Sequence, residues 1–318
     1  MVLTTARRVL RSLVVIALVT MASVALLSLA PGSAASVILG ENATPAAVAR
    51  LNAQLGMDQP LWHQYTDWLG HALRGDLGTS PVTNESVLHA VLTRLPVTLE
   101  LAAMALTLSL LVAVLLAVVS AAREGSWVDR ALTAFSSVLL SVPAFIAGPL
   151  LIYFLSLKLG WLPVSGWARI GADGLAANLR CALLPAVSIA LTEVATFHRA
   201  LRADLVSTLR EDFIAAARAK GMSPAYVMFR HALRPSSFSL ITLAGINLGR
   251  LIGGTVVVEI LFSLPGLGQL VVSSIVSRDL VSVQGIVVFV VVVYVLVNTL
   301  VDIGYHWLDP RVRKVATV

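Results

Sequence analysis

The stretch EDFIAAARAKGMSPAYVMFRHALRP, residues 211–235, interrupts a chain that is otherwise strongly apolar. Glu211 opens a short predicted helix, because a carboxylate near a helix N-terminus favours the helix dipole. Gly221 is typical of a residue that ends a helix, and Ser223 is a typical N-cap that is followed here by a proline at the first helical position. The stretch therefore predicts two short helices that meet at an angle.

Both predicted helices are amphipathic. Their apolar or small residues share one face each, namely Phe213, Ala216 and Ala217 in the first helix and Tyr226, Phe229 and Leu233 in the second. Two roles fit this pattern. The helices either lie under the protein's own bundle or form a protruding knob that a soluble partner binds.

The rest of the chain has the composition of a membrane protein. Its 318 residues are 58% hydrophobic and only 13% charged, and the mean hydropathy is +0.88. A membrane-spanning helix needs about 20 mostly apolar residues. We predict six such spans, at residues 13–29, 97–119, 132–157, 183–200, 239–261 and 283–305. The predicted fold class is an all-α membrane protein with six transmembrane helices.

The distribution of basic residues predicts the orientation of these spans. With the N-terminus inside, fifteen of the 23 lysines and arginines fall in inside segments, seven fall outside and Arg250 falls within a span. Excess positive charge marks the cytoplasmic side. Both termini and residues 211–235 are therefore expected in the cytoplasm. The single Cys181 excludes an intrachain disulfide and gives no information on the redox compartment.

Two N-terminal features leave alternatives open. The run at residues 13–29, with Arg7, Arg8 and Arg11 before it, is predicted to be a retained span, although a cleavable secretory signal has a similar pattern. Residues 31–95 contain LWHQYTDWLGHAL at residues 61–73, whose apolar residues recur at helical spacing. This helix either lies on the outer membrane surface or belongs to a small folded cap.

Residues 211–235 resemble the cytoplasmic loop of ATP-binding-cassette importer permeases. The shared pattern is Glu-Ala-Ala, three residues, Gly, nine residues, Ile, one residue and Leu-Pro, and it falls here on Ala215, Ala216, Ala217, Gly221, His231 and Leu233. Two positions depart from the pattern, because Ala215 replaces the glutamate and the proline is displaced to Pro235. ARAKG and RHALR are forms seen in the peptide-transporting branch.

Other stretches resemble the dipeptide and oligopeptide permease class over nearly the whole chain. They are GDLGTS at residues 75–80, RLPVTLELA at 94–102, VVVEILFSLPGLGQL at 256–270, RD at 278–279, VQG at 283–285 and LDPRVR at 308–313. Together, in this order and spacing, they are far more specific than the loop pattern by itself.

This resemblance implies that the knob is a coupling helix, which binds a groove on a cytosolic ATPase and passes its movements to the spans. The residues assigned to this coupling are Glu211, Ala216, Ala217, Arg218, Lys220, Gly221, Ser223, Arg230 and Leu233. The ATPase is expected to be another chain, since no G-x-x-x-x-G-K-[ST] phosphate loop occurs here. We therefore expect this chain to bind no cofactor and no metal, with ATP and Mg used by partner subunits.

The predicted fifth span carries two further signals. Gly245, Gly249 and Gly253 recur every four residues, which favours close helix packing in lipid. Arg250 lies near mid-span, where a charge is costly unless it faces protein or water. We assign Arg250, Glu259 and Asn247 to the substrate pathway. Glu259 is about 13 Å from Arg250 along a helix axis, too far for direct pairing, and Glu193 in the fourth span is a weaker candidate.

The resemblance implies a peptide importer of the bacterial cytoplasmic (inner) membrane. Its partners would be a second homologous permease, two ATPase subunits, an extracytoplasmic binding protein or lipoprotein, a di- or oligopeptide and membrane lipid, with no nucleic acid. Predicted parts are a first span in residues 1–30, an extracytoplasmic segment 31–95, a permease core 96–310 with a coupling loop 201–236, and a cytoplasmic tail 311–318. Related permeases carry nickel complexes or glutathione, and both remain alternatives.

Other function classes have less support in the sequence. A self-contained secondary carrier often shows an inverted repeat, and we find no internal repeat. The hydrolase motifs G-x-S-x-G and H-E-x-x-H are both absent. The chain is therefore expected to be a transporter subunit and not an enzyme.

Overall fold

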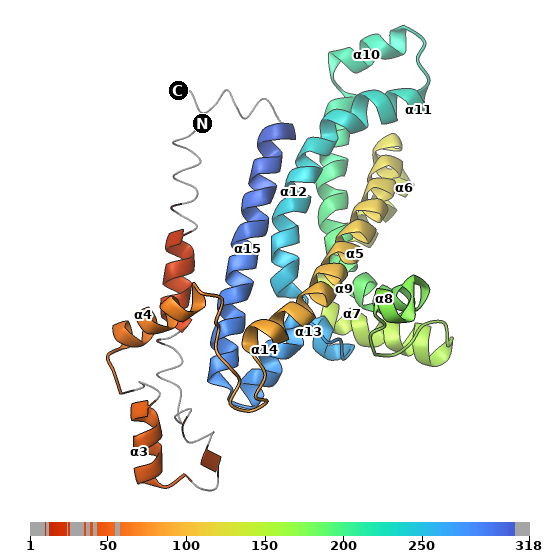
Figure 1. Cartoon of the computed structure of the whole chain (residues 1–318). Coiled ribbons are helices and arrows are strands. Elements are labelled where there is room, and N and C mark those ends of the chain that lie inside the picture. The colour runs from red at the N-terminus through yellow and green to blue at the C-terminus, as the bar shows by residue number, and fades with distance from the viewer. Residues whose placement is uncertain are drawn as a thin grey trace. The chain divides into compact units, whose positions relative to one another are not determined.

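The computed structural model describes residues 58–308 continuously, together with residues 43–54 and 13–23 and the single positions 10, 25, 35, 39 and 40. These residues are mostly helical, with one isolated antiparallel bridge between Thr79 and Ser86 (Figure 1). Part of the first predicted span, and the predicted cytoplasmic tail at residues 311–318, lie outside the described residues.

The labelled helices follow one another along the chain. They are α3 (Pro45–Gln54), α4 (Leu61–Ala72), α5 (Val87–Ala122), α6 (Trp127–Ser141), α7 (Ala144–Leu151), the π-helix η2 (Ile152–Lys158), α8 (Ile170–Asp173), α9 (Leu175–Leu209), α10 (Asp212–Ala219), α11 (Pro224–Tyr226), the π-helix η3 (Val227–Ala232), α12 (Leu233–Gly254), α13 (Val256–Leu261), α14 (Leu267–Val276) and α15 (Leu280–Leu308).

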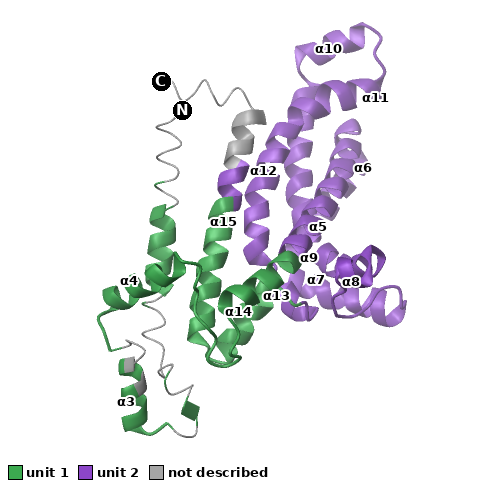
Figure 2. Cartoon of the chain, in the orientation of Figure 1, with its two compact units in different colours: residues 1–98, 265–296 green, residues 99–264, 297–318 purple. Residues whose placement is uncertain are grey.

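The chain divides into two compact units, coloured separately in Figure 2. Unit 1 consists of residues 1–98 and 265–296, and unit 2 consists of residues 99–264 and 297–318. Helices α5 and α15 each begin in unit 1 and continue into unit 2.

Unit 1 brings together stretches that are far apart in sequence. The hydroxyl of Ser80, which ends the GDLGTS stretch, donates a 2.6 Å hydrogen bond to Oδ2 of Asp279 in the RD stretch. The backbone N–H of Leu267 donates to Oγ1 of Thr98 at 2.9 Å. The apolar core around these contacts consists of Leu77, Val87, Ala90, Val91, Leu267, Leu270 and Ile286. Several of the stretches that carry the resemblance are therefore in mutual contact.

Helix α4 confirms the helix expected from LWHQYTDWLGHAL. Trp68 and Ala72 pack against the unit 1 core, whereas Trp62 is exposed and none of the residues of α4 is fully buried. The helix thus lies on this core with one side and leaves the opposite side uncovered by the described residues.

Unit 2 is built around α9. Helices α6, α7 and α12 all contact it, and its core includes Ala113, Ala117, Ala121, Phe197, Leu201, Leu205, Ile214, Ala217, Val227, Met228, Ala232, Leu240 and Ala244. Small residues of α5 and large residues of α9 therefore pack beneath the loop that joins α9 to α12.

Within the described residues, three helices are long and apolar enough to cross a membrane: α5, α9 and Leu280–Val301 of α15. The full helices α5, α9 and α15 contain the predicted spans 97–119, 183–200 and 283–305. At about 1.5 Å per residue, the 36 residues of α5 extend about 54 Å, well beyond a hydrocarbon core of about 30 Å. We infer that α5 continues into the polar region on at least one side.

The predicted span at 132–157 falls on two helical segments that are sharply bent. Helix α6 ends at Ser141, and the following helical segment Ala144–Lys158 is bent from it by 100°. Val142 is extended, with φ −101° and ψ 107°, as the residue before a proline usually is, and Pro143 also lacks a backbone N–H. The Val-Pro pair thus breaks an apolar run that has the length of one span.

The predicted fifth span at 239–261 is also interrupted. Helix α12 ends at Gly254 and α13 begins at Val256, with Thr255 between them. Oγ1 of Thr255 donates a 2.8 Å hydrogen bond to Oε1 of Glu259, and both residues are fully buried. This polar contact lies at the break. Two consecutive glycines, which disfavour a helix, precede it.

Candidate functional site

The loop between α9 and α12 begins with α10. Glu211 is its N-cap residue, Asp212 lies in the first turn and Arg218 lies in the last turn. Acidic residues near the N-terminus and basic residues near the C-terminus both favour the helix dipole. The charge pattern of this stretch is thus matched to a helix of eight residues.

Gly221 ends α10 as expected. Its φ is +75°, in the left-handed region that glycine adopts without steric cost. The N–H of Gly221 donates to the carbonyl of Arg218 at 2.9 Å, and the N–H of Met222 donates to the carbonyl of Ala217 at 3.3 Å. These two bonds form a Schellman motif, which satisfies carbonyls that the helix end would otherwise leave unpaired.

Ser223 is the N-cap of the next helix, as predicted. Its Oγ accepts a 3.3 Å hydrogen bond from the N–H of Tyr226, and Pro224 is the first helical residue. The second predicted helix begins where expected but is not a separate short helix, because α11, η3 and α12 follow one another without a break. Val227 and Ala232 join the same core as Leu240 of α12, so this continuous helical length is anchored in the core of unit 2.

The apolar faces predicted for the two helices are mostly not buried. Phe213, Tyr226 and Phe229 are 49%, 51% and 59% exposed. Ile214 and Val227 are buried in their place and anchor the loop in the unit 2 core. The protein's own bundle therefore packs against one side of the loop and leaves three aromatic side chains exposed.

The residues assigned to coupling divide by burial. Most are exposed, namely Glu211, Ala216, Arg218, Lys220, Gly221, Ser223 and Arg230. Ala217 is buried in the core of unit 2 and Leu233 is half-buried against that core. Ala217 and Leu233 can support the loop, whereas the exposed residues can contact a partner.

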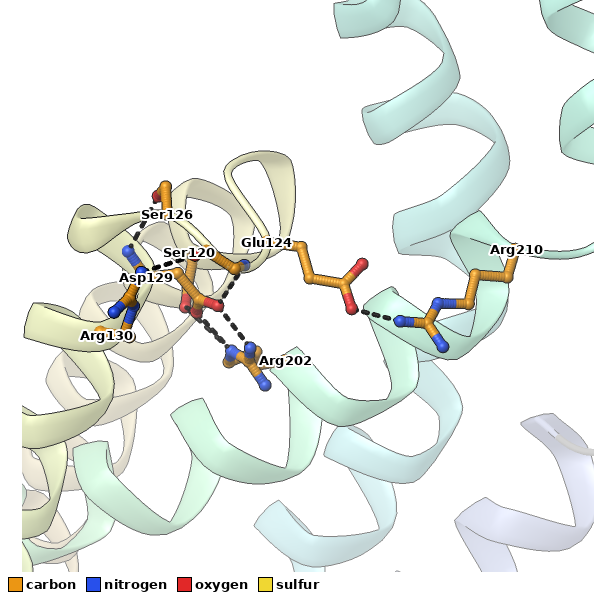
Figure 3. Close-up of polar contacts among 8 residues, drawn as sticks. Ser120, Glu124, Ser126, Asp129, Arg130, Arg202 and Arg210 are labelled. Carbon is orange, nitrogen blue, oxygen red and sulfur yellow. Dashed lines mark hydrogen bonds and ion pairs between the residues drawn. The ribbon is translucent and has the colours of Figure 1, made fainter.

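A second feature near this loop was not anticipated from the sequence. The Asp129 carboxylate, only 4% exposed, accepts hydrogen bonds from Nε and Nη2 of Arg202, each at 2.6 Å, and from the backbone N–H of Gly125 at 2.9 Å (Figure 3). The hydroxyl of Ser120 donates to the same carboxylate. This cluster joins the end of α5, the start of α6 and α9. The S-x-x-D spacing of Ser126 and Asp129 is typical of a capping box and could have drawn attention to this carboxylate.

An exposed ion pair lies beside that cluster. Nη2 of Arg210 donates to Oε1 of Glu124, and Figure 3 shows the two side chains reaching toward each other from α9 and the α5–α6 turn. A shallow hollow there is lined by Arg123, Arg210 and Arg218 among other residues. The charged residues that line this hollow are thus basic, apart from Glu124.

The residues assigned to the substrate pathway lie in or near α12. Nη2 of Arg250 is 3.7 Å from Oε1 of Glu193 in α9, and Nδ2 of Asn247 donates to Oε2 of Glu193 at 2.8 Å. The structure brings Arg250 and Asn247 together around Glu193, while Glu259 is fully buried in α13. The sequence predicted only a minor role in the substrate pathway for Glu193, because the packing of α9 against α12 is what brings it close to Arg250.

The three glycines assigned to helix packing differ in their surroundings. A Cβ at Gly249 would lie 2.8 Å from Oδ1 of Asn298, which is too close. A Cβ at Gly253 would have no heavy atom within 4 Å, and Gly245 is half-buried. A Cβ at Gly249 would thus displace the Asn298 side chain, whereas one at Gly253 would displace nothing.

Metal binding has no obvious place in the described part of the chain. No cluster of three or more histidine, cysteine, aspartate or glutamate side chains that could hold a metal ion occurs there.

Two family models together match nearly the entire chain. "Binding-protein-dependent transport system inner membrane component" matches residues 85–314, and "Binding-prot-dependent transport system membrane comp, N-term" matches residues 1–102.

Several curated proteins are similar over almost their full length. The "Probable peptide ABC transporter permease protein y4tP" of Sinorhizobium fredii is 39% identical over 307 residues, covering 96% of this chain and 98% of that protein. The "Di/tripeptide transport system permease protein DppB" of Pseudomonas aeruginosa is 36% identical, with coverage of 93% and 94%. The "Glutathione transport system permease protein GsiC" of Escherichia coli is 34% identical, with coverage of 89% and 90%.

Solved structures with the same fold are more distant in sequence. A chain of the inward-facing MetNI methionine ABC transporter matches with a TM-score of 0.53 at 17% identity, covering 67% of this chain and 93% of that one. At this identity the match shows that the fold is shared.

Proposed function

Because this chain belongs to the family of binding-protein-dependent transport system inner membrane components, we propose that it is a permease subunit of an ATP-driven peptide importer. An extracytoplasmic binding protein delivers the peptide, and alternating access moves it into the cytoplasm. The curated relatives named for peptide and di/tripeptide transport support this substrate class.

The observation that carries the coupling role is the exposure of Phe213, Tyr226 and Phe229 on an anchored loop. Aromatic side chains are enriched among the residues that dominate binding energy at protein interfaces. The anchoring residues Ile214 and Val227 belong to the same core as Leu205 of α9. A cytosolic ATPase that binds the exposed side of the loop would therefore move α9 and α12 with it.

The Asp129 cluster extends this connection to a further helix. Arg202 lies in α9, three residues before Leu205, and holds the start of α6 through Asp129. Coupling between distant sites requires packed elements that both sites bias. We infer that the loop, α9 and the start of α6 move together when the ATPases open and close.

The membrane topology belongs to the same proposal. Six membrane crossings, cytoplasmic termini and an extracytoplasmic segment at residues 31–95 agree with the excess of basic residues in the segments assigned inside. The bent pair α6–α7 would count as one crossing and α12–α13 as another. The bacterial inner membrane is the location implied by the family description.

The partners follow from the same family. They are a second homologous permease, two ATPase subunits that use ATP and Mg, and a binding protein or lipoprotein. This chain would bind no cofactor of its own. The basic side chains of Arg123, Arg210 and Arg218 around the shallow hollow favour an ATPase surface with acidic residues.

Glutathione is a second candidate substrate, favoured by the 34% identity to a glutathione permease. Glutathione is itself a tripeptide with one unusual linkage, so the two candidates share a chemical class. Nickel complexes and a self-contained carrier have no comparable observation in their favour.

The substrate is tested with the complete transporter. The cognate binding protein is purified with its ligand, the ligand is identified by mass spectrometry, and its ATP-dependent uptake is measured in cells that express the whole complex. We expect a di- or oligopeptide. A nickel complex as the only ligand, or uptake that persists without the ATPases, would overturn the proposal.

The docking role is tested with Phe229→Ala. Loss of a well-packed aromatic contact costs about 2 kcal/mol, which is about thirtyfold in affinity, so the ATPases should co-purify poorly. Phe145→Ala is the matched control, since Phe145 in α7 is 56% exposed but lies outside the loop. Equal ATPase recovery with both variants would contradict docking at this loop.

A further inference from the structure

Arg250 lies on an exposed face of α12. Its side chain is 70% exposed, whereas Asn247, Gly249 and Leu251 beside it are buried. The same face continues along the helix through Thr242, Ile246 and Gly253, which are also exposed. This face combines a charge, a hydroxyl and a glycine with isolated apolar residues, unlike the uniformly apolar surface expected toward lipid.

Glu193 is the acidic neighbour of Arg250 in the described structure. The Glu193 side chain is only 7% exposed, and Asn247 holds its Oε2 with a 2.8 Å hydrogen bond. Its Oε1 lies 3.7 Å from Nη2 of Arg250, which is too long for a hydrogen bond. The buried carboxylate therefore partly neutralises Arg250 without occupying the hydrogen-bond donors of the guanidinium.

The energetics disfavour a lipid-facing position for this cation. A charge near the middle of a span is costly in hydrocarbon, and such residues usually face a water-filled cavity or protein. If the Arg250 side chain simply extended to the membrane surface, it would not need the buried Glu193 carboxylate beside it. The guanidinium is planar, and its donors match both oxygens of a carboxylate.

We propose that Arg250 binds the C-terminal carboxylate of the transported peptide, and that Glu193, positioned by Asn247, holds Arg250 when no peptide is present. This inference rests on the proposed function as a peptide permease subunit. The terminal carboxylate is common to all linear peptides, so such a site accepts varied side chains. Competition from Glu193 keeps the peptide carboxylate weakly bound to Arg250, as transport requires. An acidic residue of a permanently bound partner subunit would gain nothing from such competition.

The test compares a peptide with its C-terminal amide. ATP-dependent uptake of both is measured with the complete transporter and the same binding protein, whose own preference cancels when permease variants are compared. A charged hydrogen-bonding contact contributes about 1.5–3 kcal/mol, about tenfold or more in affinity. We expect Arg250→Leu to raise the half-saturating concentration about tenfold for the free acid and to leave that of the amide unchanged.

Two further variants sharpen the comparison. Glu193→Gln removes the competing charge, so it should lower the half-saturating concentration for the free acid and not for the amide. Ile246→Ala is the matched control, since Ile246 is 52% exposed one turn away on the same face and carries no charge. It should leave the ratio of acid to amide at its wild-type value.

The outcomes separate this inference from the proposed function. Equal effects of Arg250→Leu on acid and amide, or none on either, would overturn the carboxylate site while leaving peptide transport intact. If Arg250→Leu does not assemble, an unchanged acid-to-amide ratio in Glu193→Gln overturns it instead. A wild-type complex that takes up neither peptide would refute the proposed function itself.

Discussion

Arg202 and Asp129 are joined by two parallel hydrogen bonds, from Nε to Oδ1 and from Nη2 to Oδ2, each 2.6 Å long (Figure 3). The pair links α9 to the start of α6 close to the loop that we assign to coupling. A paired guanidinium and carboxylate with this geometry are among the stronger polar contacts in proteins.

Asp129→Asn should destabilise the protein markedly. Asp129 is 4% and Arg202 27% exposed, so removal of the carboxylate leaves a half-buried cation without its counter-ion. The expected cost is about 3 kcal/mol, measured as a lower unfolding midpoint in detergent. Glu124→Gln is the control, because the Glu124–Arg210 pair is exposed and contributes less than about 1 kcal/mol. Equal losses in the two variants would show that burial does not matter here.

Gly221→Val should uncouple ATP hydrolysis from transport. The added side chain has open space, because no heavy atom lies within 4 Å of the position that its Cβ would take, but the φ of +75° is strained for a β-branched residue. The strain of about 1 kcal/mol or more should shift the turn that aims α10. Substrate-stimulated ATPase activity should fall while the binding protein still binds its peptide.

Gly221→Asn is the matched control for that substitution. Asparagine adopts left-handed backbone conformations more readily than valine, so its ATPase stimulation should stay near the wild-type level. Normal transport by Gly221→Val would refute the role of this turn.

Cysteine labelling in intact cells should place Thr83 outside and Ala225 inside. Both positions are exposed, and Ala225 is preferred to Ser223 because the Ser223 hydroxyl caps a helix. The native Cys181 is first replaced by serine. A membrane-impermeant maleimide should label only the probe at Thr83, and labelling of the Ala225 probe from outside would invert the topology.

Gly249→Ala should destabilise the packing of α12 against Asn298. The new methyl group would lie 2.8 Å from Oδ1 of Asn298, and overpacking of this kind costs about 1–3 kcal/mol. Gly253→Ala should be neutral or slightly stabilising, because its Cβ meets nothing within 4 Å and alanine favours a helix. Thermal unfolding of the two variants in detergent distinguishes them, and equal midpoints would contradict the packing role of Gly249.

The amino-acid sequence determined the local features of this protein. The left-handed stop at Gly221 and the N-cap at Ser223 depend on residues within a few positions, and both are confirmed. The family membership also follows from residue patterns along the chain. Three of the apolar runs correspond to long apolar helices, since a run of that length has few other stable states in a membrane.

The tertiary structure decided which of these features meet. The sequence does not show that Val227 is buried while Phe229 is exposed, because both are apolar and only the packing of the unit 2 core selects the buried side. The sequence also does not predict the ion pair between Arg250 and Glu193. That ion pair depends on how two helices pack against each other, and helix periodicity carries no information about which helices become neighbours.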